Sequence, residues 1–274
     1  MGGASAIATR NRGSRRERGV SPCYRAAVDT TLALDPRPVG SDPAAPIEVE
    51  WLGRVPYREA WARQHELVTE RAADRILDRI LLLEHPAVLT LGRHADDSHV
   101  LATPDELARR GIEVIRIERG GEVTYHGPGQ LVAYPILALS RRGLLLRPLV
   151  RALEAAMVET CASLGVIAGR REGEPGCWVD PEGPRPRKIG ALGIRVERGI
   201  SYHGIALNVA PNLADFELID ACGMPDVEST SIAREAGWPK RAADSAETAA
   251  AVEAAGRTFA AAAVRHLVAA GRPG

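Results

Sequence analysis

Residues 119–131, RGGEVTYHGPGQL, constrain the fold of this chain more than any other stretch. They contain four glycines and one proline, a composition that favours a loop over a packed strand or helix. The runs on either side, residues 112–117 (IEVIRI) and 131–137 (LVAYPIL), are apolar, and their patterns predict strands. The sequence therefore predicts a glycine-rich loop held between two strands.

Two interpretations of this loop are open. Glycines let a backbone approach a ligand closely, and the side chains of Arg119, Thr124, Tyr125 and His126 can donate hydrogen bonds, so the loop could form part of a binding site. A hairpin turn that is merely rich in glycine would have the same composition. The rest of the chain has to decide between them.

The overall composition excludes several classes of protein. The chain has 274 residues, 45% of them hydrophobic, which is enough for a sizeable core. Lys and Arg together number 35, as do Asp and Glu, so bulk charge gives no reason to expect nucleic acid or an anionic membrane as a partner. No apolar run approaches the roughly 20 residues that span a bilayer, and we expect a soluble protein.

The cysteines predict a reducing compartment and no metal site. Cys23, Cys161, Cys177 and Cys222 lie far apart, without a CxxC pair or a Cys/His spacing typical of zinc. With no secretory signal, free thiols and a cytoplasmic location are expected. Cys161 falls in a predicted helix and Cys177 in a predicted strand, and we expect both to pack in the core.

The chain divides into a tail and one predicted domain. Residues 1–45 are rich in Arg, Gly, Ser and Pro, and their apolar residues follow neither the spacing of a helix nor that of a strand. This composition predicts disorder. Residues 46–270 contain no linker and form the predicted domain. Strands are predicted at 47–52, 79–84, 87–91, 112–117, 131–137, 177–179, 188–196 and 200–209, and helices at 57–74, 103–110, 147–165 and 242–269. This mixed order predicts an α+β fold, a mixed β-sheet flanked by helices. Strands 79–84 and 87–91 are expected to pair around the turn between them.

A second unusual segment is the turn ACGMP at residues 221–225. Cys222 differs from the other cysteines because glycine and proline surround it, so that its sulfur could be presented to a substrate and a backbone N–H could face an oxyanion. Lys188 begins a predicted strand, and its position alone favours a solvated charge over a catalytic one. A tripeptide is also repeated in the chain: Tyr125-His126-Gly127 recurs as Tyr202-His203-Gly204.

Three motifs in order, RGGEVTYHGPGQL, RKIGALGIRVERGISYHGIALNV and ACGM, closely resemble the octanoyltransferases of lipoate biosynthesis. The resemblance covers about residues 47–240. It implies the mixed sheet flanked by helices of the lipoate-protein ligase and biotin protein ligase catalytic domains, in agreement with the fold class above. The sequence departs from the family at Ala221, where proline commonly precedes the cysteine.

The resemblance implies that Cys222 accepts an octanoyl group from octanoyl-acyl carrier protein as a thioester. The group then passes to a specific lysine of a lipoyl domain, the first step of endogenous lipoate biosynthesis, and no cofactor is implied. Lys188 would activate the thiol, because a free thiol with a pKa of about 8.5 is mostly protonated at neutral pH. Lys188 could act as a nearby ammonium or as a neutral base, and the sequence leaves both roles open.

The resemblance also implies a substrate-binding set and partners. The expected acyl-binding residues are Arg119, Gly120, Gly121, Glu122, Val123, Thr124, Tyr125, His126, Ala191, Leu192, Gly193, Gly204, Ile205 and Ala206. The acceptors would be the lipoyl domains of 2-oxoacid dehydrogenase E2 subunits and the glycine cleavage H protein. Because these partners and the carrier protein are acidic, we expect basic residues near the site mouth. The candidates are Arg141, Arg142, Arg147, Arg185 and Arg187.

Three other functions compete with this one. An ATP-dependent lipoate or biotin ligase would need a nucleotide site and no catalytic cysteine, and the chain has no Walker-type loop. A papain-like hydrolase could use Cys222 with His126 or His203, yet its motif around the thiol is missing. A non-catalytic acyl-carrier-binding protein would not need both Lys188 and Cys222. For His126 and His203, a half-buried structural role is as good an interpretation as a substrate contact.

Overall fold

A computed structural model of the chain describes residues 42–220 and 227–271. Most of the predicted tail and the predicted nucleophile Cys222 lie outside these residues. Within them, an eight-stranded sheet has the order β1-β2-β6-β10-β9-β8-β7, with β11 pairing with β9, and a three-stranded sheet has the order β4-β3-β5.

The strands of the larger sheet are β1 (Ile47–Arg54), β2 (Asp78–Glu84), β6 (Gln130–Ile136), β7 (Gly169–Arg171), β8 (Glu174–Val179), β9 (Arg187–Glu197), β10 (Ile200–Asn208) and β11 (Glu228–Ser229). Those of the smaller sheet are β3 (Val88–Leu91), β4 (Glu113–Arg116) and β5 (Val123–His126). The helices are α2 (Tyr57–Ala72), α3 (Pro104–Arg110), α4 (Leu146–Ser163), α5 (Ile232–Glu235) and α6 (Ala246–Gly271), with short 3₁₀ turns η1 (Asp97–His99) and η2 (Leu213–Leu218).

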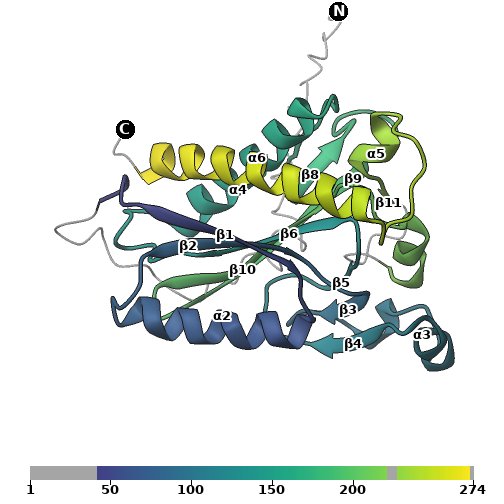
Figure 1. Ribbon diagram of the computed structural model, residues 1–274, viewed down its shortest axis with the longest axis horizontal. Helices are drawn as coiled ribbons and strands as arrows, with labels where there is room; N and C mark the ends of the chain where they lie inside the picture. Colours follow the sequence, from purple (N-terminus) through teal and green to yellow (C-terminus); the bar gives the residue numbers. More distant parts are fainter. Residues whose placement is uncertain (1–41, 221–226, 272–274) are drawn as a thin grey trace, which may run out of the picture.

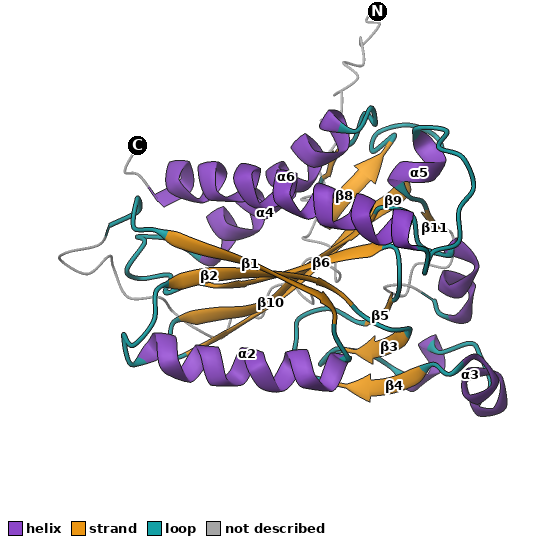
Figure 2. Ribbon diagram, viewed as in Figure 1, coloured by secondary structure: helices purple, strands orange, loops and turns teal. Residues whose placement is uncertain are grey.

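Helices cover both faces of the larger sheet. Figure 1 shows α4 and α6 on one face and α2 on the other, with the smaller sheet and α3 beyond one end of α2, and Figure 2 shows the same layers by element type. The central strands β6 and β10 are buried along their whole length, because each has a hydrophobic layer above and below. The predicted α+β class is confirmed. No helix in the described ranges is both long and apolar enough to cross a membrane.

Local sequence signals place several elements as predicted. Helix α3 begins after Thr103, whose hydroxyl accepts from the Glu106 N–H at 3.2 Å, and ends at Gly111 with φ of +65°. Strands β9 and β10 form the predicted hairpin, paired from Ile200–Glu197 through Leu207–Gly190. Cys161 and Cys177 are both buried, with sulfurs 4.0 Å apart, as expected for packing residues.

The expected pairing of β2 with β3 is wrong. Strand β2 lies between β1, which runs parallel to it, and β6, which runs antiparallel, so both of its edges are occupied. Strand β3 instead pairs with β4 and β5 in the smaller sheet. The chain therefore passes from one sheet to the other across the three residues 85–87.

The glycine-rich segment is not a continuous loop, and this too corrects the prediction. Residues Val123–His126 form β5, antiparallel to β3. A four-residue strand with glycines on both sides resembles a turn in sequence, because the pairing that defines it comes from β3, over 30 residues away. Residues 119–122 and 127–129 lie outside the strand.

Arg142 joins the start of the described chain to the sheet. Its side chain is 1% exposed and pairs with the buried carboxylate of Asp78. It also donates to the carbonyl oxygens of Pro43, Ala45 and Pro46 at 3.1, 2.8 and 3.2 Å. The expectation that Arg142 faces an acidic partner protein is wrong, because its guanidinium is buried and pairs with groups of its own chain.

Candidate active site

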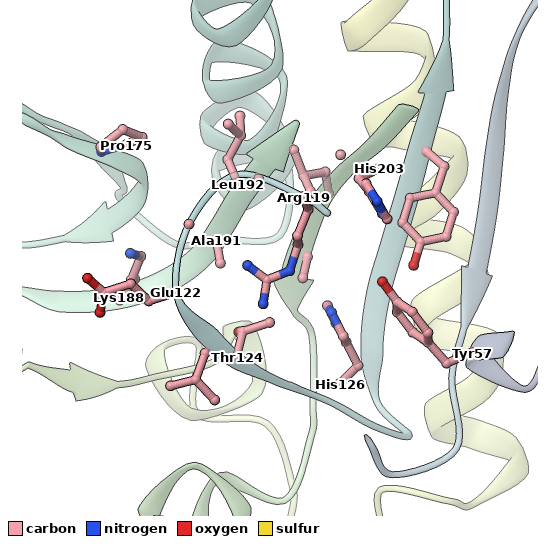
Figure 3. A pocket seen from close by; sticks show the side chains of 17 residues that line it. Tyr57, Arg119, Glu122, Thr124, His126, Pro175, Lys188, Ala191, Leu192 and His203 are labelled. Atoms are coloured by element: carbon pink, nitrogen blue, oxygen red, sulfur yellow. The ribbon is translucent and has the colours of Figure 1, made fainter. Parts of the chain in front are cut away.

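A cavity of about 680 Å³, counting its open mouth, lies where the two sheets meet. The smaller sheet contributes β5 and the segment before it, and the larger sheet contributes the β9–β10 hairpin (Figure 3). The lining residues are Tyr57, Arg119, Gly121, Glu122, Val123, Thr124, His126, Tyr134, Pro175, Lys188, Ala191, Leu192, Gly193, His203, Gly204, Ile205 and Ala206. All of the predicted substrate-binding residues except Gly120 and Tyr125 belong to this set, together with Lys188.

Tyr125 points away from the cavity. Successive side chains on a strand face opposite sides, so Thr124 and His126 face the cavity while Tyr125 is buried behind β5. The Tyr125 ring packs edge-on against Phe216, and its hydroxyl donates to Asp215 at 2.9 Å. The Tyr125 side chain therefore supports the wall of the cavity from outside.

Arg119 holds the segment before β5 in place. Its guanidinium is buried and donates to the carbonyl oxygen of Thr90 at 2.7 Å, to the Thr90 hydroxyl at 2.9 Å and to the Gly120 carbonyl at 3.1 Å. Figure 3 shows the group in the middle of the site. A planar group with five donors can fix several acceptors at once, and here it ties the segment before β5 to β3.

Glycines let the two walls approach one another. A Cβ on Gly193 of β9 would lie 2.6 Å from the Gly120 oxygen of the opposite wall, while Gly204 of β10 allows close approach to the neighbouring strand β6, where a Cβ would lie 2.1 Å from the Ala133 oxygen. The Gly120 N–H donates across the gap between the walls to the Ile194 carbonyl at 3.4 Å. Gly120, although not a lining residue, thus ties the loop to β9.

Lys188 lines the cavity and lies beside one flank of the segment that carries Cys222. Ser229 of β11 is its register partner, and the Thr230 N–H donates to the Lys188 carbonyl at 2.9 Å. On the other flank, the Asp220 N–H donates to the His99 carbonyl at 2.8 Å. The His99 side chain in turn lies 3.4 Å from Glu122, a lining residue. Cys222 itself lies outside the described residues.

The inner end of the cavity is aromatic, and no pattern in the sequence predicts it. Tyr57 begins α2 and Tyr134 lies in β6, both in patterns that predict ordinary core residues. Behind them, His85 Nδ1 donates to the Val55 carbonyl at 2.7 Å, so its Nε2 accepts from the Tyr134 hydroxyl at 2.8 Å. Burial lowers the pKa of His85 from 6.5 to about 4, which keeps this imidazole neutral.

A hydrogen-bond chain fixes the tautomer of His126. Asn208 donates its amide to the Thr230 carbonyl at 2.9 Å, so its oxygen accepts from the Gln130 amide, also at 2.9 Å. The Gln130 oxygen then accepts from His126 Nδ1 at 2.7 Å. Burial lowers the pKa of His126 well below 6.5. The neutral ring consequently carries its lone pair on Nε2.

His203 turns toward the cavity through an unusual backbone. Its φ is +54°, a left-handed value uncommon outside glycine, and it lets the adjacent rings of Tyr202 and His203 stack at 4.9 Å instead of facing opposite sides. Burial lowers the pKa of His203, although Glu118 lies 3.3 Å from its Nε2. For Glu118, burial raises the pKa, but hydrogen bonds from His203 and Trp61 outweigh it and bring the pKa to about 2.

The arrangement suits an aliphatic ligand with a reactive end. The lining is largely apolar, and Lys188 contributes an amine to it. In the described part of the chain, no group of three or more His, Cys, Asp or Glu side chains is placed to hold a metal ion. The walls can thus bind a chain of methylene groups and leave its polar end beside Lys188.

Comparison with solved structures identifies the fold. A bipartite lipoate protein ligase from Thermoplasma acidophilum, described with its E2 lipoyl domain, aligns with a TM-score of 0.55 over 78% of this chain and 82% of its own, at 15% identity. Lipoate-protein ligase A bound with ATP aligns with a TM-score of 0.55 over 78% and 84%, at 16% identity.

Comparison with curated proteins identifies the family. Residues 56–255 match the model of the lipoyl protein ligase A/B catalytic domain. A protein of Chloroflexus aurantiacus named octanoyltransferase is 45% identical over 202 residues, covering 73% of this chain and 89% of its own. Another of Acidobacterium capsulatum is 47% identical over 192 residues, covering 67% and 78%. The chain therefore belongs to the octanoyltransferases of the lipoyl protein ligase A/B catalytic-domain family.

Proposed function

We propose that this enzyme transfers the octanoyl group of octanoyl-acyl carrier protein to a specific lysine of lipoyl domains through a thioester on Cys222. The observation that carries the proposal is the largely apolar cavity lined by Lys188, whose strand partner Ser229 lies on one flank of the segment containing Cys222. The acceptors are the lipoyl domains of 2-oxoacid dehydrogenase E2 subunits and the glycine cleavage H protein. The site is cytoplasmic, where a catalytic thiol stays reduced.

The reaction has two balanced halves. In the first, the Cys222 thiolate attacks the carbonyl carbon of the donor thioester, a new C–S bond forms, and the carrier thiol leaves with a proton. In the second, the acceptor amine attacks the same carbon, the amide C–N bond forms, and the bond to Cys222 breaks. The proton lost by the amine restores the protonation state of the Cys222–Lys188 pair.

The walls set the position of the acyl chain. The small side chains of Ala191 and Ala206 leave room beside residues 119–122, and the apolar lining favours methylene groups over water. Holding the chain there brings the thioester to the mouth in a fixed orientation, which is a major source of rate enhancement in acyl transfer.

The test is octanoyl transfer to a purified lipoyl domain without ATP, followed by intact-mass measurement of both proteins. We expect an octanoyl adduct on the enzyme when the acceptor is omitted, absent from Cys222→Ala, and transfer to the lipoyl domain when it is added. A strict requirement for ATP, or turnover by Cys222→Ala at the normal rate, would contradict the proposal.

The chain offers a matched control for Lys188, since its other lysine is Lys240, an exposed residue that does not line the cavity. Lys188→Arg should lower kcat by at least about 100-fold, within the range for losing a proton-transfer group. Lys240→Arg should retain normal turnover. Equal effects of the two changes would remove Lys188 from the mechanism.

A further inference from the structure

The side chain of Lys188 lies over an aromatic ring. Its Nζ is 5.0 Å from the centre of the Trp178 indole, and the guanidinium carbon of Arg171 is 5.4 Å from the same ring. Trp178 is fully buried, and its Nε1 donates to the Glu174 carbonyl at 3.1 Å. The indole is thus held by its own strand while two cations contact it.

The backbone is shaped to bring Lys188 to this ring. Along β8 and β9, Cys177 is the partner of Gly190 and Trp178 that of Lys188, so one additional residue, Ile189, is inserted on β9. Such a bulge re-aims the side chains beside it. Without it, Lys188 would not lie opposite Trp178.

Gly176 leaves space for the lysine stem. A Cβ at this position would lie 3.2 Å from Cε of Lys188 and 2.5 Å from the Gly190 carbonyl oxygen, and the φ of Gly176 is +134°, a value that favours glycine. The bulge and the glycine together build the contact between the amine and the ring. The fold therefore places the Lys188 backbone beside the ring and leaves space for its side chain.

We propose that Trp178 is a positioning residue whose indole face holds the ammonium form of Lys188 at the mouth of the cavity. The proposal rests on the role of Lys188 in the proposed function. The negative face of an aromatic ring attracts a cation and has no comparable attraction for a neutral amine. Of the two roles open to Lys188, the ring favours the ammonium that pairs with the Cys222 thiolate, over the neutral base.

The first measurement tests the contact without any enzymatic turnover. Reductive methylation with ¹³C-formaldehyde labels Lys188, Lys240 and the terminal amine and keeps their charge, and Lys240→Arg assigns the lysine signals. A methyl group above an indole experiences its ring current, so the Lys188 methyl protons should resonate upfield of those of Lys240 in the otherwise unchanged protein. Coincident signals would overturn the proposal, whatever the enzyme is found to catalyse.

The second measurement tests the consequence for catalysis. Trp178→Phe keeps an aromatic face and Trp178→Leu removes it. We expect Trp178→Leu to lower kcat roughly 5- to 30-fold, with the KM for octanoyl-carrier protein unchanged, and Trp178→Phe to retain most of the turnover. The Leu variant should also move the pH profile of kcat. Equal losses in both variants, or an unchanged profile in a folded Leu variant, would overturn the role of the ring.

These two measurements separate the inference from the proposed function. If the upfield signal is present but no thioester forms on Cys222, the proposed function fails while the contact stands. If the thioester forms and the signal is absent, only the inference fails. If Trp178→Leu does not fold, the ring-current measurement and Trp178→Phe still decide the outcome.

Discussion

Three buried imidazoles, His85, His126 and His203, gather around the inner end of the cavity, and burial lowers the pKa of each. Each is tied to a neighbour that fixes its ring: a carbonyl for His85, an amide oxygen for His126 and a carboxylate for His203. In the unfolded chain these rings would titrate near 6.5. The folded protein consequently binds fewer protons than the unfolded chain in mild acid.

This difference predicts an acid-sensitive fold. For His85, the folded pKa of about 4 lies below the unfolded value of 6.5, so its contribution is fully present above pH 6.5 and is lost as the pH falls toward 4. The loss amounts to about 3 kcal/mol. Urea unfolding at several pH values should show stability falling through this window. His85→Asn, which keeps a donor for Val55, should flatten the slope.

The control for that experiment is His94→Asn, which removes an exposed imidazole. If His85→Asn keeps the full slope of the unmodified protein, the buried ring is not the source of the pH dependence.

Single residues also show which parts of the site the sequence could reveal. Lys188 is one of two lysines among 35 basic residues, a rarity that itself singles it out, since arginine serves for ordinary surface charge. Tyr57 and Tyr134 give no such signal, because a tyrosine in an amphipathic helix or a buried strand has the pattern of a core residue. The sequence around Trp178 likewise does not mark it as a site residue, because only the register of β8 against β9 brings it to Lys188.

At the scale of elements, the sequence predicted what depends on nearby residues and missed what depends on pairing. The spacing of apolar residues, the capping residues and the turn residues predict the helices α2, α3 and α4 and the β9–β10 hairpin. The split of β2 and β3 between two sheets does not, because strand partners are chosen by contacts far away in the chain. The same holds for β5, whose four residues become a strand only beside β3.

The close approach of β9 to residues 119–122 gives a prediction about one glycine. Gly193→Ala would place a methyl group 2.6 Å from the Gly120 oxygen, and the loop would have to move. We expect a loss of roughly 1–3 kcal/mol in stability and a larger KM for the octanoyl donor, both measurable on the purified variant.

Gly169→Ala is the matched control, because that glycine is also in a strand but outside the cavity, and its added Cβ would meet only the side chain of Pro181, at 3.2 Å. It should leave the KM unchanged. A Gly193→Ala variant that binds the donor as well as the parent would show that the loop tolerates displacement.

At the scale of the whole molecule, adjacent arginines have opposite surroundings. Arg142 is buried against Asp78 and three backbone carbonyls, whereas Arg141 lies at the surface and pairs with Asp74 at 2.6 Å. Asp78 also accepts from Arg71 at 2.6 Å and from the Ala138 N–H at 2.9 Å. This junction connects α2, β2, the end of β6 and residues 42–46.

These two adjacent arginines give a prediction about the free energy of unfolding. Arg142→Met leaves the Asp78 carboxylate short of a partner and three carbonyls without a donor, so it should cost about 3–5 kcal/mol. Arg141→Met breaks an exposed pair and should cost no more than about 1 kcal/mol. Urea denaturation of both variants checks the difference, and similar costs would show that burial of Arg142 contributes little.

The guanidinium at the centre of the cavity has one further consequence. An enzyme that carries an activated acyl group exposes it to every nucleophile within reach, its own side chains included. Among the described residues that line the cavity, Lys188 alone bears an amine, while the long basic side chain nearest the acyl slot is Arg119, which stays protonated in proteins and does not act as a nucleophile. Under the proposed function, arginine at this position therefore adds no second amine, beside that of Lys188, that the acyl group could modify.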